Sequence, residues 1–333
     1  MATRGYSGYK GRKSPWKIVA AILLVLVILA AAGVLVLQRY LVYDASGTPH
    51  LRLPGQEEIK TPSSSGGASS SGDLGPVDVT IDPPERQSVL GYLLTAPNAD
   101  LTPYLAPDGD LNAVAVTLKG ADGQLRTDWQ DDETLKSVLS DESRHTIARI
   151  SCFLDGANAR SQVKEMGLEN TGGYIFYDAT NRNWLDPGKP AAREFLLDLI
   201  RQAAEAGFDE ILLTEVFYPT EGKLDKIAYS ADRTESLTLF LTEAKGLLAD
   251  YPGVTLSVAV TDTLLLDGED ETSGQSLSGF AALADAIYAL CEGGDYEAAK
   301  AAVAEAGGGK TTAFVALFDG VGYPPEEYLL PEA

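Results

Sequence analysis

Carboxylates are the reactive side chains that recur where the apolar segments of this chain end. Glu215 closes the apolar run 209–218, and Asp262 follows the run 254–260. Hydrolysis of a glycosidic bond needs two carboxyl groups about 5–9.5 Å apart, because one protonates the leaving oxygen while the other attacks or activates water. We therefore take Glu215 and Asp262 as the candidate catalytic residues of a glycoside hydrolase.

Chance alone also places acids at segment ends, because the chain has 48 Asp and Glu residues. Asp155, Glu292 and Asp319 are further acids of this kind. Aromatic side chains near the same segments could stack on sugar rings, although packing in a core is the commoner role of such residues. They are Trp129, Tyr177, Trp184, Tyr218 and Tyr323.

The balance of charge excludes several classes of function. The formal net charge is -22, and the first 37 residues hold five bases and no acid, so the whole acidic excess lies beyond them. A domain this acidic is repelled by phosphate backbones, so nucleic acid is not an expected partner. Only two histidines are present, which argues against a histidine-based zinc or iron site. We predict no metal and no cofactor.

The N-terminal part has the pattern of a membrane anchor. Residues 18–37 are twenty residues without a charge, which as a helix span roughly 30 Å, the thickness of a hydrocarbon core. The basic stub 1–17 favours a cytoplasmic N-terminus. A cleaved signal peptide is the alternative, but the apolar run is longer than the usual h-region. We expect a single-pass membrane protein whose lipid contact is made by residues 18–37.

A linker and one large domain follow the anchor. Residues 38–76 include the run SSSGGASSSGD, a composition typical of a flexible tether. Residues 77–333 are close in number to the roughly 250 residues of one α/β barrel. With the N-terminus in the cytoplasm, this acidic domain is predicted to be extracellular.

Short, continuous apolar runs alternate with helical patterns throughout 77–333, which is typical of a parallel sheet covered by helices. Seven runs are read as strands: 88–96, 111–118, 146–154, 209–218, 254–260, 285–291 and 311–318. Five segments have helical spacing: 132–139, 190–206, 236–248, 278–284 and 296–306. We predict a TIM-type (β/α) barrel. Its eighth strand is either the weak run 77–81 or missing, because only a proline-rich tail follows residue 318.

Both cysteines fall in predicted strands. Cys152 lies in the third strand and Cys291 in the sixth, and these are not neighbours in a barrel. The predicted extracellular setting would allow a disulfide, but we expect two small buried thiols.

Four segments resemble a known family, the putative glycosyl hydrolase domain family. They are residues 111–125, 146–155, 183–219 and 274–288, and the WLDP and GFDEI motifs are the most specific part. The resemblance covers roughly residues 88–320. It implies an alpha-amylase-like TIM barrel that acts on, or derives from enzymes that act on, polysaccharide outside the cell.

The resemblance is incomplete at the strand ends. The family has an acid where this chain has Thr117, Thr214 and Ala259, and an arginine where it has Phe217. The resemblance carries a substrate-binding role over to residues that match or adjoin its motifs: Lys119, Asp122, Arg149, Trp184, Asp186 and Tyr218.

Three functions therefore stay open. In the first, the domain hydrolyses cell-surface or cell-wall glycan, and Glu215 replaces the missing aspartate. A shift of one residue turns a side chain to the other face of a strand, so Glu215 would need a β-bulge to reach the mouth of the barrel. In the second, the barrel is catalytically inactive and binds glycan or protein at the cell surface. In the third, it is a purely structural surface domain.

Overall fold

The computed structural model describes residues 86–104, 110–127, 129–291, 295–318, 320 and 324–332, and the short segments 41–43 and 49–51. It divides into two units, Met1–Asp78 and Val79–Ala333. In the first unit, β1 (Leu41–Tyr43) pairs antiparallel with β2 (Pro49–Leu51). The predicted stub and membrane segment lie outside the described residues, as does most of the linker. Among the residues described, no helix has the length and hydropathy to cross a membrane.

The second unit is a closed barrel of eight parallel strands, in which β14 pairs with β3 to complete the ring. In chain order the strands are β3 (Leu90–Leu94), β4 (Ala113–Lys119), β5 (His145–Ser151), β7 (Glu210–Thr214), β9 (Thr255–Val260), β12 (Ala286–Leu290), β13 (Ala313–Leu317) and β14 (Tyr328–Pro331). The predicted TIM-type barrel and all seven predicted strands are confirmed. Parallel strands that are buried on both faces explain why their sequences are continuously apolar.

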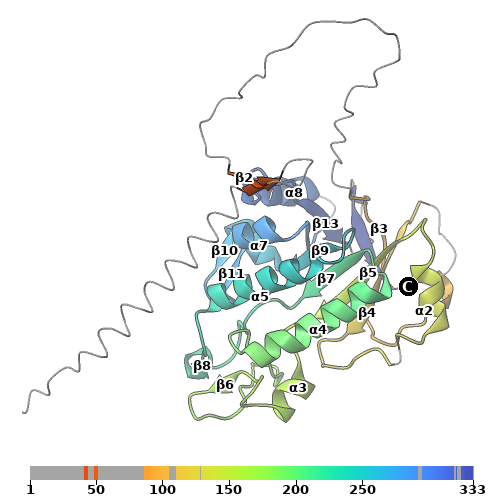
Figure 1. The fold of residues 1–333 in the computed structure, drawn as a ribbon. Helices are drawn as coiled ribbons and strands as arrows, with labels where there is room; N and C mark the ends of the chain where they lie inside the picture. The colour runs from red at the N-terminus through yellow and green to blue at the C-terminus, as the bar shows by residue number, and fades with distance from the viewer. Residues whose placement is uncertain are drawn as a thin grey trace, which may run out of the picture. The chain divides into compact units, whose positions relative to one another are not determined.

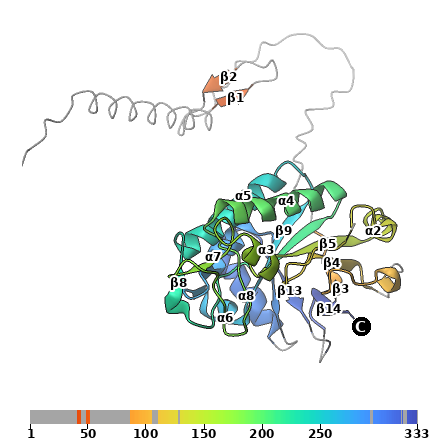
Figure 2. The ribbon, with the colours of Figure 1, turned by 90° about the horizontal axis from the view of Figure 1, so that it is seen from below.

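Helices cover the outside of the barrel, and Figures 1 and 2 show α4 and α5 side by side over the strands. The five predicted helices are confirmed as α2 (Glu133–Leu139), α4 (Pro190–Ala206), α5 (Arg233–Leu248), α7 (Leu277–Leu283) and α8 (Tyr296–Ala306). Two short helices after β5 and β9 have no helical pattern long enough to be predicted, α3 (Gly156–Ser161) and α6 (Asp262–Asp267).

The expectation that the barrel lacks a clear eighth strand is wrong. The proline-rich tail supplies β14, which pairs with β13 through Tyr328 and Leu329 and with β3 over four residues. The run 77–81 lies outside the described residues, and the barrel closes without it. A four-residue strand bounded by prolines gives almost no periodic signal, which is why the pattern suggested only a tail.

Short antiparallel strand pairs lie in the loops that follow the barrel strands. β6 (Glu169–Asn170) in the long β5–α4 loop pairs with β8 (Ile227–Ala228) in the β7–α5 loop. β10 (Glu269–Asp270) pairs with β11 (Gln275–Ser276) after α6. Single 3₁₀ turns occur at η1 (Thr102–Tyr104) and η2 (Leu224–Lys226). All these loops except the one with η1 lie between a barrel strand and α4, α5 or α7, so they belong to the C-terminal face of the barrel.

The interior of the barrel is a packed core. Alternate residues of the strands form one cluster inside the ring: Val89, Ala113, Ala115, Ile147, Leu212, Ala286, Tyr288, Val315 and Leu329. A second, larger cluster lies between the strands and the helices. Side chains alternate along a strand, so every second residue counted from a member of the inner cluster also faces the barrel axis.

A charged network fills the N-terminal end of the barrel. Glu210 is fully buried, lies 2.7 Å from the His145 ring nitrogen and accepts a 2.8 Å hydrogen bond from Tyr288 Oη. Burial alone would raise the pKa of Glu210, but the hydrogen bond and charge of His145, the charge of Arg86 and a hydrogen bond from Ser257 together lower it. Arg86 pairs with Glu327 at 2.6 Å beside this network. Since sites in this fold lie at the opposite face, we assign the network to stability.

Candidate active site

The two candidate acids end neighbouring strands of the C-terminal face. β7 and β9 pair in parallel, with Leu213 opposite Val258. Glu215 comes directly after β7, and Asp262 begins α6 two residues after β9. Each chain segment leaves the barrel at this point, so both acids belong to the mouth of the barrel, where this fold places its sites.

The backbone of Glu215 has an unusual conformation. Thr214 alternates with Leu212 of the inner cluster, so a continued strand would turn Glu215 outward. Instead Glu215 has a φ of 51°, in the left-handed region that residues other than glycine rarely adopt. This turn, in place of the expected bulge, brings the carboxylate back toward the barrel mouth. Strained residues of this kind cluster at functional sites.

Arg149 is the partner of Glu215. It alternates with Ile147 of the inner cluster and therefore faces the barrel axis. Its Nη2 lies 3.4 Å from Glu215 Oε1, and the two side chains are only 13% and 21% exposed. Thr214 Oγ1 donates to the other carboxylate oxygen of Glu215. The structure thus brings together Arg149 and Glu215, two of the predicted site residues.

The threonines that stand in place of the family's acids are hydrogen bonded within the protein. Thr117 Oγ1 donates to Leu94 O at 2.7 Å and accepts from Arg149 Nη1 at 3.3 Å. A threonine can neither protonate a leaving oxygen at neutral pH nor carry the negative charge of a nucleophile. Thr117 and Thr214 therefore shape the mouth but leave Glu215 as the carboxylate beside Arg149.

Lys119 is enclosed by protein. Its Nζ lies 3.0 Å from Asp155 Oδ2, and both side chains are 0% exposed. The ammonium also donates to Ser151 O at 2.8 Å, while Asp155 caps α3 by accepting from Asn158 N. These contacts favour a structural role, in which Lys119 ties the end of β4 to the loop after β5.

The WLDP motif is buried beside the loop after β7. Asp186 is 0% exposed and accepts hydrogen bonds from Gly188 N at 2.9 Å and from Tyr218 Oη at 3.3 Å. Burial raises the pKa of Asp186 and that of Tyr218. Trp184 is 2% exposed and donates through Nε1 to Asp178. The contact between Asp186 and Tyr218 joins the β5–α4 loop to the β7–α5 loop. Because Trp184 is buried, a sugar ring cannot stack on it.

The remaining predicted residues have other surroundings or lie outside the described residues. Asp122 is exposed and closes a turn by accepting from Gln124 N at 3.0 Å. Tyr177 is 50% exposed in the β5–α4 loop, whereas Trp129 is buried. Glu292, Asp319 and Tyr323 lie outside the described residues. Among the residues described, no three acids, histidines or cysteines group as metal ligands would.

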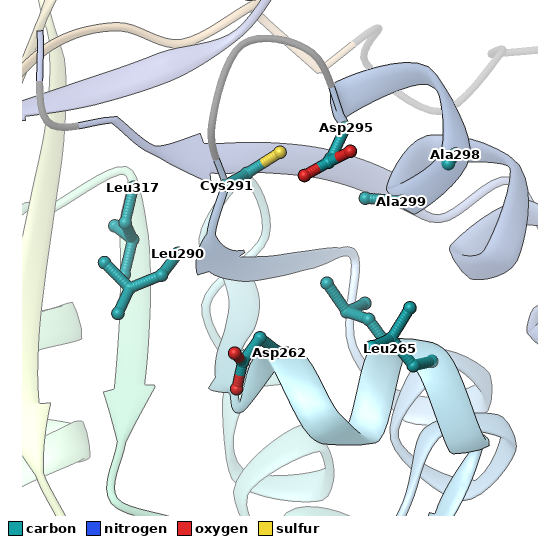
Figure 3. A pocket seen from close by; sticks show the side chains of 9 residues that line it. Asp262, Leu265, Leu290, Cys291, Asp295, Ala298, Ala299 and Leu317 are labelled. Atoms are coloured by element: carbon teal, nitrogen blue, oxygen red, sulfur yellow. The ribbon is translucent and has the colours of Figure 1, made fainter. Parts of the chain in front are cut away.

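Asp262 lines a pocket that lies over the ends of β12 and β13, with a volume of about 550 Å³. Figure 3 shows its carboxylate at the start of α6, while Asp295 points inward from the start of α8. Leu290 and Leu317, the last residues of β12 and β13, form one wall. Neither leucine was a sequence candidate, because only strand closure shows that both face the barrel axis. Both cysteines are thiols, as predicted, but only Cys152 is buried as expected, because Cys291 is partly exposed and lines this pocket.

Three solved structures are similar to this chain, each with a TM-score below 0.5. A hypothetical protein from Ruminiclostridium thermocellum is 25% identical, with 51% of this chain and 96% of that chain covered, and a TM-score of 0.42. The PgaB (BpsB) glycoside hydrolase domain from Bordetella bronchiseptica is 13% identical, with 70% and 84% covered, and a TM-score of 0.48. The glycoside hydrolase domain of PelA from Pseudomonas aeruginosa is 16% identical, with 69% and 82% covered, and a TM-score of 0.43.

No curated protein matches the chain, but one family does. Residues 102–306 match the family described as "Putative glycosyl hydrolase domain", which confirms the resemblance seen in the strand and WLDP segments. The matched range runs from the turn before β4 to the end of α8 and includes Arg149, Glu215 and Asp262. Because it spans more than half of the 333 residues, the chain belongs to the family of the putative glycosyl hydrolase domain.

Proposed function

We propose that this protein is a membrane-anchored, extracellular glycoside hydrolase that acts on cell-surface polysaccharide at the C-terminal mouth of its barrel. The observation that carries the proposal is the left-handed backbone of Glu215, which directs a carboxylate to Arg149 where the family's inward acid is replaced by Thr214. The proposal thus assigns the family's reaction to a carboxylate one residue further along the chain.

Two carboxylates divide the chemistry in this proposal. Glu215, held between Arg149 and the Thr214 hydroxyl, acts as the ionised nucleophile or base. Asp262 is exposed at the neighbouring strand end and acts as the acid that protonates the leaving oxygen. Arg149 is a positioning residue, because it fixes the orientation of the Glu215 carboxylate.

The main assay is release of reducing ends from peptidoglycan and from α- and β-glucans by the unit 79–333. Loss of an acid–base group typically lowers a rate about 10²–10⁴-fold, so we expect Glu215→Gln and Asp262→Asn each to lose activity by at least about 100-fold. Asp250→Asn is the matched control, since Asp250 is exposed at the N-terminal face. Equal activity of Glu215→Gln and the wild type would exclude this mechanism.

A second function is favoured by Thr117 and Thr214, which occupy two positions of the family's acids. In that case the barrel binds glycan without cleaving it. Pull-down of the unit 79–333 with insoluble peptidoglycan separates the two functions: retention on the glycan without any release of reducing ends supports binding alone. Retention that Glu215→Gln abolishes would place the bound glycan at the same mouth.

The anchor is tested separately from the chemistry. We expect the full chain to sediment with membranes and the chain without residues 18–37 to stay in the supernatant. Protease added outside intact cells should degrade the barrel unit but not an epitope fused before residue 1. Protection of the barrel unit in intact cells would contradict the proposed topology.

A further inference from the structure

The pocket beside Asp262 has a different character from the Arg149–Glu215 side of the mouth. Its volume of about 550 Å³ is within the range of small-molecule sites. It opens between α6 and α8, above the ends of β12 and β13. The apolar lining residues are Leu265, Leu266, Leu290, Ala298, Ala299 and Leu317.

Two of the four leucines that line this pocket are unusually exposed for their type. Leu290 follows Tyr288 of the inner cluster and faces the barrel axis, yet it is 72% exposed, and Leu266 on α6 is 86% exposed. Figure 3 shows Leu290 and Leu317 close to each other on one wall, with Leu265 on the opposite wall. Grouped, exposed leucines in a concave site are typical of a surface that takes up an apolar group.

The residues described in the lining of the pocket carry charge of one sign. Asp262 and Asp295 are the charged residues among the nine described, and none of these nine is basic. Asp295 stands at the N-cap position of α8 without a side-chain cap hydrogen bond, so capping does not occupy its carboxylate. Two carboxylates repel fatty acids, phosphates and other anions, and attract an ammonium group.

We propose that this pocket binds a small amphiphilic amine, with an alkyl or aryl body against the leucines and an ammonium group at Asp262 and Asp295. The pocket shares Asp262 with the proposed catalytic pair but includes neither Glu215 nor Arg149, and amine binding there does not require that the barrel hydrolyse glycan. Apolar burial supplies the affinity, and the two carboxylates supply the preference for a cation over a neutral or anionic molecule.

Three probes with the same body separate these contributions: 4-phenylbutylamine, 4-phenylbutanol and 4-phenylbutyrate. The full chain in lipid nanodiscs is titrated with each, and protection of Cys291 from maleimide is measured by peptide mass spectrometry. Cys291 lines the pocket, whereas Cys152 is fully buried and reports any unfolding. We expect the amine to protect Cys291 at concentrations about tenfold below those needed for the alcohol, and the carboxylate to protect least.

Variants assign the effect to the pocket. The double variant Asp262→Asn, Asp295→Asn should bind the amine about tenfold more weakly, with the alcohol unchanged. The control Asp250→Asn, Glu305→Gln removes the same net charge from exposed positions away from the pocket and should bind like the wild type. Leu290→Asn should weaken all three probes.

Three results would overturn the proposal: no protection of Cys291 by any probe, equal protection by amine and carboxylate, or equal loss of amine binding in the control. None of them bears on hydrolysis, since the reducing-end assay is carried out without these probes. Loss of hydrolysis in Glu215→Gln with amine binding intact would likewise leave both proposals standing.

Discussion

The buried ion pair between Lys119 and Asp155 allows the sharpest test of how this barrel mouth is held together. Both side chains are 0% exposed, and their charged atoms are 3.0 Å apart. The pair joins the end of β4 to the N-cap of α3, one strand away. Replacing Lys119 by methionine keeps the length of the side chain but leaves the Asp155 carboxylate buried without its cation.

The expected cost is large because the solvent cannot screen the remaining charge. Breaking a buried pair by removing one partner costs about 3–5 kcal/mol. A domain is stable by only about 5–15 kcal/mol, so Lys119→Met should remove a large fraction of the total. Asp155→Asn should cost less, since asparagine also caps a helix and Ser151 O still accepts from the ammonium.

The double variant Lys119→Met, Asp155→Asn distinguishes a coupled pair from two independent contributions. Because the uncompensated charge is gone, it should be more stable than Lys119→Met alone by at least about 1–2 kcal/mol. The control is Lys136→Met, whose partner Glu133 is 86% exposed, and it should change stability by less than about 0.5 kcal/mol.

Urea unfolding of the unit 79–333, followed by tryptophan fluorescence, measures these differences as shifts in midpoint at constant m-value. The reasoning is refuted if Lys119→Met costs less than about 1 kcal/mol, or if the effects of the two single substitutions simply add in the double variant. Additive effects would mean that the ammonium and carboxylate do not interact and that Lys119 is available for another role, such as binding substrate.

Three further predictions concern strain, pH and closure. Glu215→Gly should be more stable than Glu215→Gln by about 1 kcal/mol in urea unfolding, because glycine adopts a φ of 51° without strain. Both variants should lose activity. Equal stability of the two variants would mean that the backbone at Glu215 is not strained. Burial raises the pKa of Asp178, but hydrogen bonds from Thr180 and Arg182 lower it overall. Its stabilising contribution is therefore present above about pH 4 and lost as pH falls through the depressed pKa, so unfolding free energies should fall less steeply below pH 4 in Asp178→Asn. Leu329→Ala should cost about 2–5 kcal/mol, since Leu329 is 1% exposed inside the barrel, and a loss below about 1 kcal/mol would mean that β14 does not close it.

The strands and long helices of this fold are predictable from the sequence because their burial leaves a pattern. A parallel strand such as Ala113–Lys119 is apolar on both faces, and α4 repeats its buried residues at helical spacing. The short β14 has only four residues and carries no period. Its assignment needs the pairing with β3 at the far end of the chain, which no local pattern contains.

The candidate site is predictable only in part, because its geometry depends on contacts between distant segments. Glu215 and Asp262 can be identified as strand-end acids, but the left-handed backbone of Glu215 leaves no local signature, since glutamate is not a residue that favours it. No sequence pattern indicates that Lys119 and Asp186 are buried, because both are polar residues next to motifs. The leucine pocket arises only when α6 and α8 approach the ends of β12 and β13.

The substitution at Thr214 and the strain at Glu215 have one physical explanation. Arg149 faces the barrel axis with only 13% of its side chain exposed, and a guanidinium in that position needs an anion nearby. With threonine at position 214, the inward strand position carries no negative charge, and the next residue supplies one by turning its backbone into the left-handed region. The attraction between Arg149 and Glu215 offsets the backbone strain, so the pair can be retained for charge balance alone. That is why stability measurements on Glu215 variants cannot establish catalysis, and why release of reducing ends is the deciding measurement.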